Sequence, residues 1–410
     1  MRSKVQSLVA TEVRNDRLPG RHFLQIPGPT NVPDRILRAI DQPTMDHRSP
    51  AFAELGLRVI DGLKWLLRSS GPVVIYPGSG TGAWEAALVN ALSPGDTVLM
   101  YETGHFAQLW RALASRLGLR PEILPGDWRM GIAYDKIAER LANDTARAIK
   151  AVCIVHNETS TGCASRIDEA RRAIDSANHP ALLMVDTISS LGSMDFRHDE
   201  WKVDVTVGCS QKGLMLPPGI SFNAISEKAL LASAAAQFPR SYWAWDEMIK
   251  ANKSGYFPYT PPTNLFYGLA EAIDMLREEG LDEVFARHRR HSEATRQAVQ
   301  SWGLEVYCKN PHHYSDSLTA VLVPKGHSAD EFRRIVRENF NMSLGNGLSK
   351  LADHVFRIGH LGDFGDLMLA GTLAGIEMGL ELAAIPHQAG GVQVALRYLT
   401  SHLQDAETRA

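Results

Sequence analysis

The chain has 410 residues, with 43 Lys and Arg against 46 Asp and Glu and a formal net charge of −3. This near balance argues against a partner role for nucleic acid bound on a broad basic face. Hydrophobic residues make up 44% and charged residues 22%, proportions that exclude a disordered or fibrous chain and suit two globular domains.

The cysteines and the apolar segments indicate the compartment. The four cysteines lie far apart without a C-x-x-C spacing, so we expect neither a disulfide framework nor a metal site. Charges recur too closely in the first 25 residues for a signal peptide. The most apolar long segment, 367–385, contains two glutamates and is typical of a core helix, not of a membrane span. We therefore expect a cytoplasmic protein with no membrane partner.

Short apolar runs alternate with helical patterns over the first half of the chain. The runs typical of buried strands are 73–76, 97–100, 151–155, 181–185 and 203–207. The helical patterns between them include 81–92, 106–117 and 167–176. Because such alternation produces parallel strands covered on both faces, the sequence predicts an α/β fold with a doubly wound, mostly parallel sheet.

The pattern changes after Pro262. Two long helical stretches, 265–279 and 281–302, are followed by strands near 318–323 and 355–358 and by helices near 329–339 and 364–383. This mixture indicates a smaller α+β domain. We expect an N-terminal arm at 1–25, a large domain at 26–285, a small C-terminal domain at 286–390 and a tail at 391–410. The main boundary is placed within about ten residues.

A glycine-rich turn, Pro77–Gly82, lies between a strand and a helix. Such a turn presents backbone N–H groups to an anion, and the hydroxyls of Ser79 and Thr81 add donors, so phosphate is the expected ligand. The pattern Gly78-x-Gly80-x-x-Ala83, with Asp96 downstream, also satisfies a dinucleotide fingerprint. A third interpretation is that the glycines of this turn allow only tight packing and bind no ligand.

Two charged residues follow later strands. Asp186 ends an apolar run at the edge where α/β sheets bind ligands, although alone it equally suits a helix cap or a metal. Lys212 follows another run and lacks charged neighbours, which favours partial burial, a lowered pKa and the ability to form a Schiff base. A phosphate cradle, an edge carboxylate and such a lysine together indicate pyridoxal 5′-phosphate.

These motifs resemble those of fold-type I, class V aminotransferases, in the group of the alanine–glyoxylate and serine–glyoxylate aminotransferases. The matching segments occur in the family's order and span about residues 25–385: 27–33, 46–50, 78–88, 156–162, 186–192, 208–213, 256–262 and 356–362. The resemblance implies the fold of the pyridoxal-phosphate-dependent transferases, with a large domain built on a mostly parallel sheet and a smaller C-terminal α+β domain.

The resemblance also implies roles for single residues. Lys212 would form the Schiff base and move the substrate proton, and Asp186 would pair with the pyridine nitrogen of the cofactor. Arg357 would bind the substrate carboxylate. The other cofactor-binding residues that it implies lie around the phosphate, the phenolic oxygen and the ring face: Ser79, Gly80, Thr81, Gln211, Thr159 and Phe106.

In the family, a loop of the neighbouring subunit completes the phosphate site. The segment 256–260 matches that loop, so Thr260 and Tyr256 would reach the partner's cofactor in an obligate homodimer with shared active sites. Roles for His47, Arg48 and His360 remain open.

The implied activity is amino transfer from a small L-amino acid to glyoxylate, which gives glycine and a 2-oxo acid by a ping-pong mechanism. Serine is favoured because Asn157–Thr159 and Asp46–Arg48 resemble the serine branch. Aspartate, alanine and ureido-amino acids remain open as donors. More remote alternatives are a class V cysteine desulfurase that uses Cys308, and a nicotinamide-dependent dehydrogenase that rests on the glycine turn alone. A non-catalytic binding protein would lack Lys212.

Overall fold

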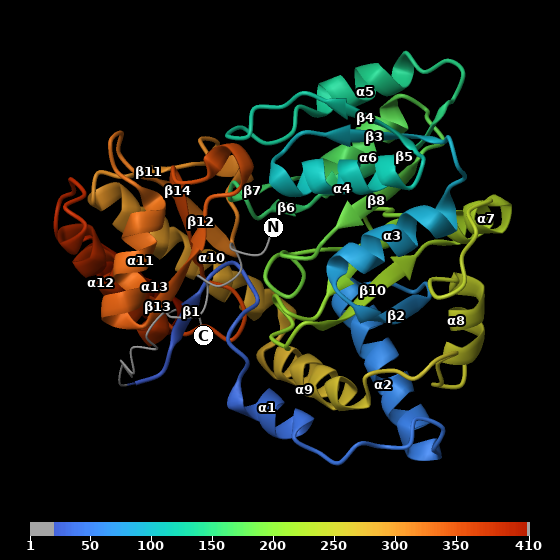
Figure 1. Cartoon of the computed structure of the whole chain (residues 1–410), viewed down its shortest axis with the longest axis horizontal. Helices are drawn as coiled ribbons and strands as arrows, with labels where there is room; N and C mark the ends of the chain where they lie inside the picture. Colours follow the sequence, from blue (N-terminus) through green and yellow to red (C-terminus); the bar gives the residue numbers. More distant parts are fainter. Residues whose placement is uncertain (1–19, 408–410) are drawn as a thin grey trace, which may run out of the picture.

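The computed structural model describes residues 20–407, which form two large sheets packed with helices (Figure 1) and a two-stranded sheet of β6 (Asn157–Glu158) and β7 (Cys163–Ala164). Figure 1 shows the smaller sheet and its helices on the left and the larger sheet on the right. None of the helices within 20–407 is long and apolar enough to cross a membrane. In the same residues, no three His, Cys, Asp or Glu side chains cluster to hold a metal ion.

The larger sheet has seven strands, six of which run parallel. Their order across the sheet is β2 (Val73–Gly78), β10 (Gly219–Ile225), β9 (Val205–Cys209), β8 (Leu182–Asp186), β5 (Ile149–Val155), β3 (Thr97–Tyr101) and β4 (Arg120–Leu124). Only β10 is antiparallel to its neighbours, β2 and β9. The expectation of an α/β fold with a mostly parallel sheet is therefore confirmed, although the sequence patterns did not identify β4 and β10.

Helices cover both faces of this sheet, because its strands are apolar on both sides. In β2, Val73 and Ile75 belong to one core, and Val74 and Tyr76 to the other. One core includes α2 (Pro50–Leu67), α5 (Tyr134–Ala142), α6 (Ile167–Ser176) and α9 (Thr263–Glu279). The other includes α3 (Gly80–Ala91), α4 (His105–Arg116), α7 (Glu227–Ala235) and α8 (Trp245–Asn252). The short helix α1 (Asp34–Ile40) packs against α9.

The smaller sheet is mixed. Its order is β1 (Phe23–Gln25), β13 (Met342–Asn346), β14 (Val355–Gly359), β12 (Leu318–Leu322) and β11 (Glu305–Val306). The helices of this part are α10 (Leu281–Ser301), α11 (Ala329–Phe340), α12 (Asp366–Leu382) and α13 (Gly391–Glu407). The edge strand β1 comes from the start of the chain and pairs parallel with β13.

The expected boundary between the two domains, at residue 285, falls inside α10, which begins at Leu281. The division of the chain into these domains stays a proposal. Most of the expected arm, residues 1–19, lies outside the described residues, and 23–25 form β1. In the expected tail, α13 extends to Glu407 and residues 408–410 lie outside the described part.

Candidate active site

Three turns meet at one edge of the large sheet. β2, β8 and β9 are parallel, so their carboxyl ends lie together. The glycine turn follows β2, Asp186 is the last residue of β8, and Lys212 follows β9. The charges of Asp186 and Arg357 both act on the pKa of the Lys212 amine, although Arg357 belongs to the small sheet. The structure therefore brings Lys212, Asp186 and Arg357 into one site between the two sheets.

Lys212 is held in a buried position. Its Nζ donates a hydrogen bond to the carbonyl of Pro27. A Cβ at Gly28 would lie 2.2 Å from Cδ of Lys212 and 2.7 Å from its Nζ, so a side chain at position 28 would displace the end of the lysine from this place. Burial lowers the pKa of the amine to about 8. At pH 7 about one tenth of Lys212 is then neutral, which is the nucleophilic form of an amine.

Asp186 is a buried carboxylate, with a side chain that is 4% exposed. Its pKa is raised to about 7, chiefly by burial and also by the negative charge of Glu158. The hydrogen bond of 2.7 Å that Oδ1 accepts from the N–H of Ile188 acts in the opposite direction. A buried carboxyl without a full cationic partner is stabilised by a ligand that brings a positive N–H. A protonated pyridine nitrogen is such a group.

The glycine turn leads directly into α3. Ser79 and Thr81 are exposed, and the N–H groups of a first helical turn have no partners within their own helix. A Cβ at Gly80 would lie 2.3 Å from Cδ1 of Ile188, so glycine lets the helix begin against the Asp186 turn. The side-chain oxygen of Gln211 is buried and has no hydrogen-bond partner among residues 20–407. The hydroxyls and N–H groups of the glycine turn are donors that fit a phosphate group.

Phe106 and Thr159 are fixed by the segment 157–162. Phe106 lies in the first turn of α4, and its N–H donates to Oε1 of Glu158 at 3.2 Å. The hydroxyl of Thr159 donates to Oγ of Ser189 at 3.2 Å, in a buried polar network. These contacts hold the backbone of Phe106 and the hydroxyl of Thr159, and the roles of both residues toward a cofactor stay predictions.

Arg357 is only 7% exposed, yet it bonds to carbonyl groups instead of carboxylates. Its Nε donates to the carbonyl of Asn346 at 2.7 Å and its Nη1 to that of Thr159 at 2.9 Å. Burial lowers its pKa to about 10. A buried guanidinium without a carboxylate partner among residues 20–407 suits the α-carboxylate of an amino acid.

Other candidates lie apart from this cluster. Thr260 is exposed in the loop between α8 and α9, and Tyr256 packs against the core beside α2 and α9. Within residues 20–407 neither side chain bonds to the glycine turn, so a role across a dimer stays a prediction. Arg48 is exposed before α2. His360 is fully buried between the carbonyl of Asp316 and the hydroxyl of Thr319, and burial lowers its pKa, so it is a neutral core residue.

Two residues of the site were not assigned a role from the sequence. Gly28 and Glu158 both lie in segments that resemble motifs of the family. This resemblance is the sequence signal from which a role for them could have been predicted. The space that Gly28 leaves for Lys212 and the bonds that Glu158 makes to α4 depend on contacts between distant segments. Cys308 is 2% exposed, which disfavours it as the mobile nucleophile that a desulfurase needs.

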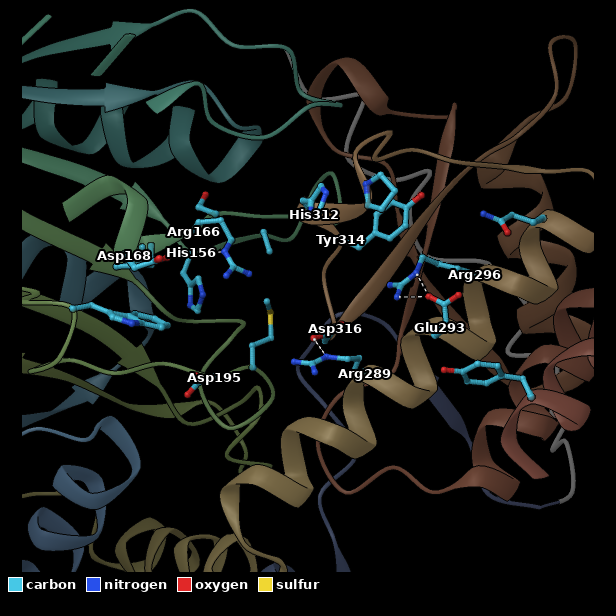
Figure 2. Close-up of a pocket in the computed structure, with 18 residues that line it drawn as sticks. His156, Arg166, Asp168, Asp195, Arg289, Glu293, Arg296, His312, Tyr314 and Asp316 are labelled. Carbon is cyan, nitrogen blue, oxygen red and sulfur yellow. Dashed lines mark hydrogen bonds and ion pairs between the residues drawn. The ribbon is translucent and has the colours of Figure 1, made fainter. Parts of the chain in front are cut away.

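A cavity of about 760 Å³ also lies between the parts that carry the two sheets, and Lys212 does not line it (Figure 2). Figure 2 shows Glu293 bonded to Arg296, and Asp316 beside Arg289. Each carboxylate that lines the cavity accepts a bond of 3.1 Å or less from an arginine or a serine: Asp168 from Arg172, Asp195 from Arg197, Glu293 from Arg296 and Asp316 from Ser292. The acids are thus satisfied within the chain, and the chemistry concentrates at Lys212.

Several proteins similar to this chain in sequence and in fold are aminotransferases. The family described as aminotransferase class V matches residues 63–359. A serine–glyoxylate aminotransferase of Methylorubrum extorquens is 46% identical over 390 residues, which cover 93% of this chain and 97% of the relative. An L-aspartate–glyoxylate aminotransferase of Paracoccus denitrificans is 42% identical over 387 residues, 94% of this chain and 98% of the relative. The crystal structure of a pyridoxamine–pyruvate aminotransferase from Mesorhizobium loti superposes with a TM-score of 0.86 at 26% identity, covering 94% of this chain and all of that one.

The fold, and the grouping of a buried lysine with a carboxylate and an arginine, agree with an aminotransferase. The chain belongs to the class V aminotransferase family, which uses pyridoxal 5′-phosphate.

Proposed function

We propose that this enzyme binds pyridoxal 5′-phosphate and transfers the amino group of L-serine to glyoxylate, giving glycine and the 2-oxo acid of serine. The observation that carries the proposal is that three buried titratable side chains, Lys212, Asp186 and Arg357, lie in one site. Together they can bind a substrate carboxylate and a protonated ring. The 46% identity to a serine–glyoxylate aminotransferase supports serine as the donor and glyoxylate as the acceptor.

Each of the three groups then has one task. When bound, the cofactor supplies an electron sink for the charge that develops at the substrate Cα. Arg357 would bind the substrate carboxylate and so orient the substrate with its Cα–H bond roughly perpendicular to the plane of the cofactor ring. The neutral amine of Lys212 removes the proton from Cα, and its ammonium form returns a proton. Asp186 keeps the ring nitrogen protonated.

The remaining residues hold the cofactor in place. Ser79, Gly80, Thr81 and Gln211 bind the phosphate, with the first turn of α3 adding its N–H groups. Phe106 stacks on the ring, because its π face is sufficient for stacking. Thr159 lies near the phenolic oxygen.

Two chains build each site. Thr260 and Tyr256 reach the phosphate of the partner subunit, in agreement with the exposure of Thr260 in one chain. Sedimentation should therefore show a dimer, and Thr260→Ala should weaken cofactor binding without changing the oligomeric state. A monomer with full activity would refute the shared site.

The absorption spectrum tests the function. The visible band of the bound cofactor should disappear when L-serine is added and return when glyoxylate follows, and Lys212→Ala should show neither change. If the purified protein shows no such band after incubation with pyridoxal 5′-phosphate, the proposal is wrong.

The identity to an aspartate–glyoxylate aminotransferase makes aspartate the second candidate donor. Parallel titrations with L-serine, L-aspartate and L-alanine rank the donors by kcat/KM. A higher value for aspartate would replace serine in the proposal and leave the chemistry unchanged.

A further inference from the structure

Glu158 is a fully buried carboxylate next to Thr159, on the short strand β6 (Asn157–Glu158). It forms no ion pair with an arginine or lysine among the described residues, and all its hydrogen-bond donors are neutral. Oε1 accepts bonds from the N–H of Phe106 at 3.2 Å, the N–H of Ser160 at 3.1 Å and the hydroxyl of Ser160 at 2.6 Å. Oε2 accepts from the N–H of Ala107 at 3.2 Å. A buried charge that lacks a cation requires such compensation.

The bonds to Phe106 and Ala107 make Glu158 the cap of α4. This helix has Gly104 at its N-cap position, which offers no side chain for the task. A Cβ at Gly104 would lie 2.5 Å from Cγ of Glu158, so the glycine makes room for the distant carboxylate. The hydroxyl of Ser160 completes the cap, because it accepts from the N–H of His105 at 3.0 Å. A negative charge at this helix end is also stabilised by the helix dipole.

The cap joins two parts of the active site. Phe106 begins α4, and Thr159, the residue after Glu158, accepts the bond from Nη1 of Arg357. The carboxylate of Glu158 and the backbone of Thr159 therefore set the position of Phe106 relative to Arg357. The negative charge of Glu158 also raises the pKa of Asp186, in the same direction as the larger effect of burial. It raises the pKa of Arg357 as well, against burial, which lowers that pKa.

We infer that Glu158 is a positioning residue, which holds the ring of Phe106 at a fixed distance from Arg357 so that cofactor and substrate are aligned. This inference rests on the proposed function, because it takes Phe106 as the platform of the cofactor ring. Both carboxylate oxygens of Glu158 are bonded to α4 or to Ser160, so Glu158 acts through these neighbours.

The test compares Glu158→Gln with Glu102→Gln in the holoenzyme. Glu102 precedes the same helix but accepts its bonds from Trp128 and Gln108, so its substitution is a matched control. In Glu158→Gln the new NH₂ group faces an N–H donor, and we expect hydrogen exchange at the amides of Phe106 and Ala107 to accelerate about tenfold, as for a lost helix cap. The dissociation constant for pyridoxal 5′-phosphate should rise about tenfold and kcat should fall, while the control keeps wild-type values for all three.

Two results would overturn the inference. Unchanged exchange at Phe106 and Ala107 would refute the cap. Faster exchange with cofactor affinity and kcat equal to those of Glu102→Gln would refute the positioning role. If Glu158→Gln does not fold, Ser160→Ala replaces it. This variant removes the two bonds of the Ser160 hydroxyl, one to Glu158 and one from His105, but keeps the carboxylate and its bonds to Phe106 and Ala107, so it should give smaller changes of the same sign.

Phe106→Leu separates this inference from the proposed function. It keeps the backbone bonds of the cap, so its amide exchange should stay at the wild-type rate while cofactor affinity falls. If Phe106→Leu binds the cofactor as tightly as the wild type, the stacking role is wrong, whereas the cap is judged by the Glu158 variant alone.

Discussion

Replacing Gly28 by alanine should displace the catalytic amine without any change to Lys212 itself. A Cβ at position 28 would lie 2.2 Å from Cδ of Lys212, whereas ordinary contacts begin at 3.4 Å. The lysine side chain must therefore retreat by at least about 1.2 Å, and its Nζ would leave the carbonyl of Pro27. A misplacement of about 1 Å in an active site costs about 10²-fold in rate.

Backbone strain contributes separately and has its own control. Gly28 has φ +89°, and an alanine in this left-handed region costs about 1–2 kcal/mol in stability. Gly303 has φ +77°, and a Cβ at this position would meet nothing within 4 Å, so Gly303→Ala carries similar strain without the clash. Both variants should therefore lose similar thermal stability, measured by calorimetry.

Steady-state kinetics with L-serine and glyoxylate distinguish the two effects. We expect kcat to fall about 10²-fold in Gly28→Ala and to stay near the wild-type value in Gly303→Ala. If Gly28→Ala retains kcat within about threefold of Gly303→Ala, close packing on Lys212 is not needed and the reasoning is refuted.

Four further outcomes follow from the site. Arg357→Lys should raise KM for serine about 10–100-fold with a smaller change in kcat, because a lysine lacks the planar pair of donors; an unchanged KM would exclude Arg357 from carboxylate binding. Asp186→Asn should lower kcat about 10²–10³-fold with folding intact by circular dichroism, because an amide does not stabilise a protonated ring nitrogen. Burial lowers the pKa of Lys212 to about 8, and only the neutral amine reacts with pyridoxal 5′-phosphate. The rate at which the apoenzyme captures the cofactor, measured by stopped flow, should therefore rise with pH through about 8 and then level off. A midpoint near 10.5 would contradict the burial of the amine. Cys308→Ser should keep transaminase kcat within about twofold, and neither form should release sulfide from cysteine, because the thiol of Cys308 is buried.

The local patterns of apolar residues predicted most strands of the large sheet. The runs at 73–76, 97–100 and 151–155 are strands in the structure, because strands buried on both faces are continuously apolar. The segment 219–225 was missed, since the prolines before it masked the start of β10, an antiparallel strand inserted between β2 and β9. The strand β1 has only three residues and exists through its pairing with β13.

For the site, the sequence alone indicated the chemistry. The absence of charged neighbours around Lys212 predicted its burial, and the structure gives the amine a pKa of about 8 for that reason. The glycine turn and Asp186 follow strands of a parallel sheet, so their meeting at one edge was predictable from topology.

The tertiary structure decided what surrounds these groups. Gly28 lies 184 positions from the lysine that it accommodates, and Glu158 caps a helix that begins 53 positions earlier in the chain. Arg357 reaches the site from the other sheet and is oriented by the carbonyl of Thr159. Periodicity and motifs describe neighbours along the chain, whereas these contacts depend on the packing of the two sheets against each other, which sets the distances between distant residues.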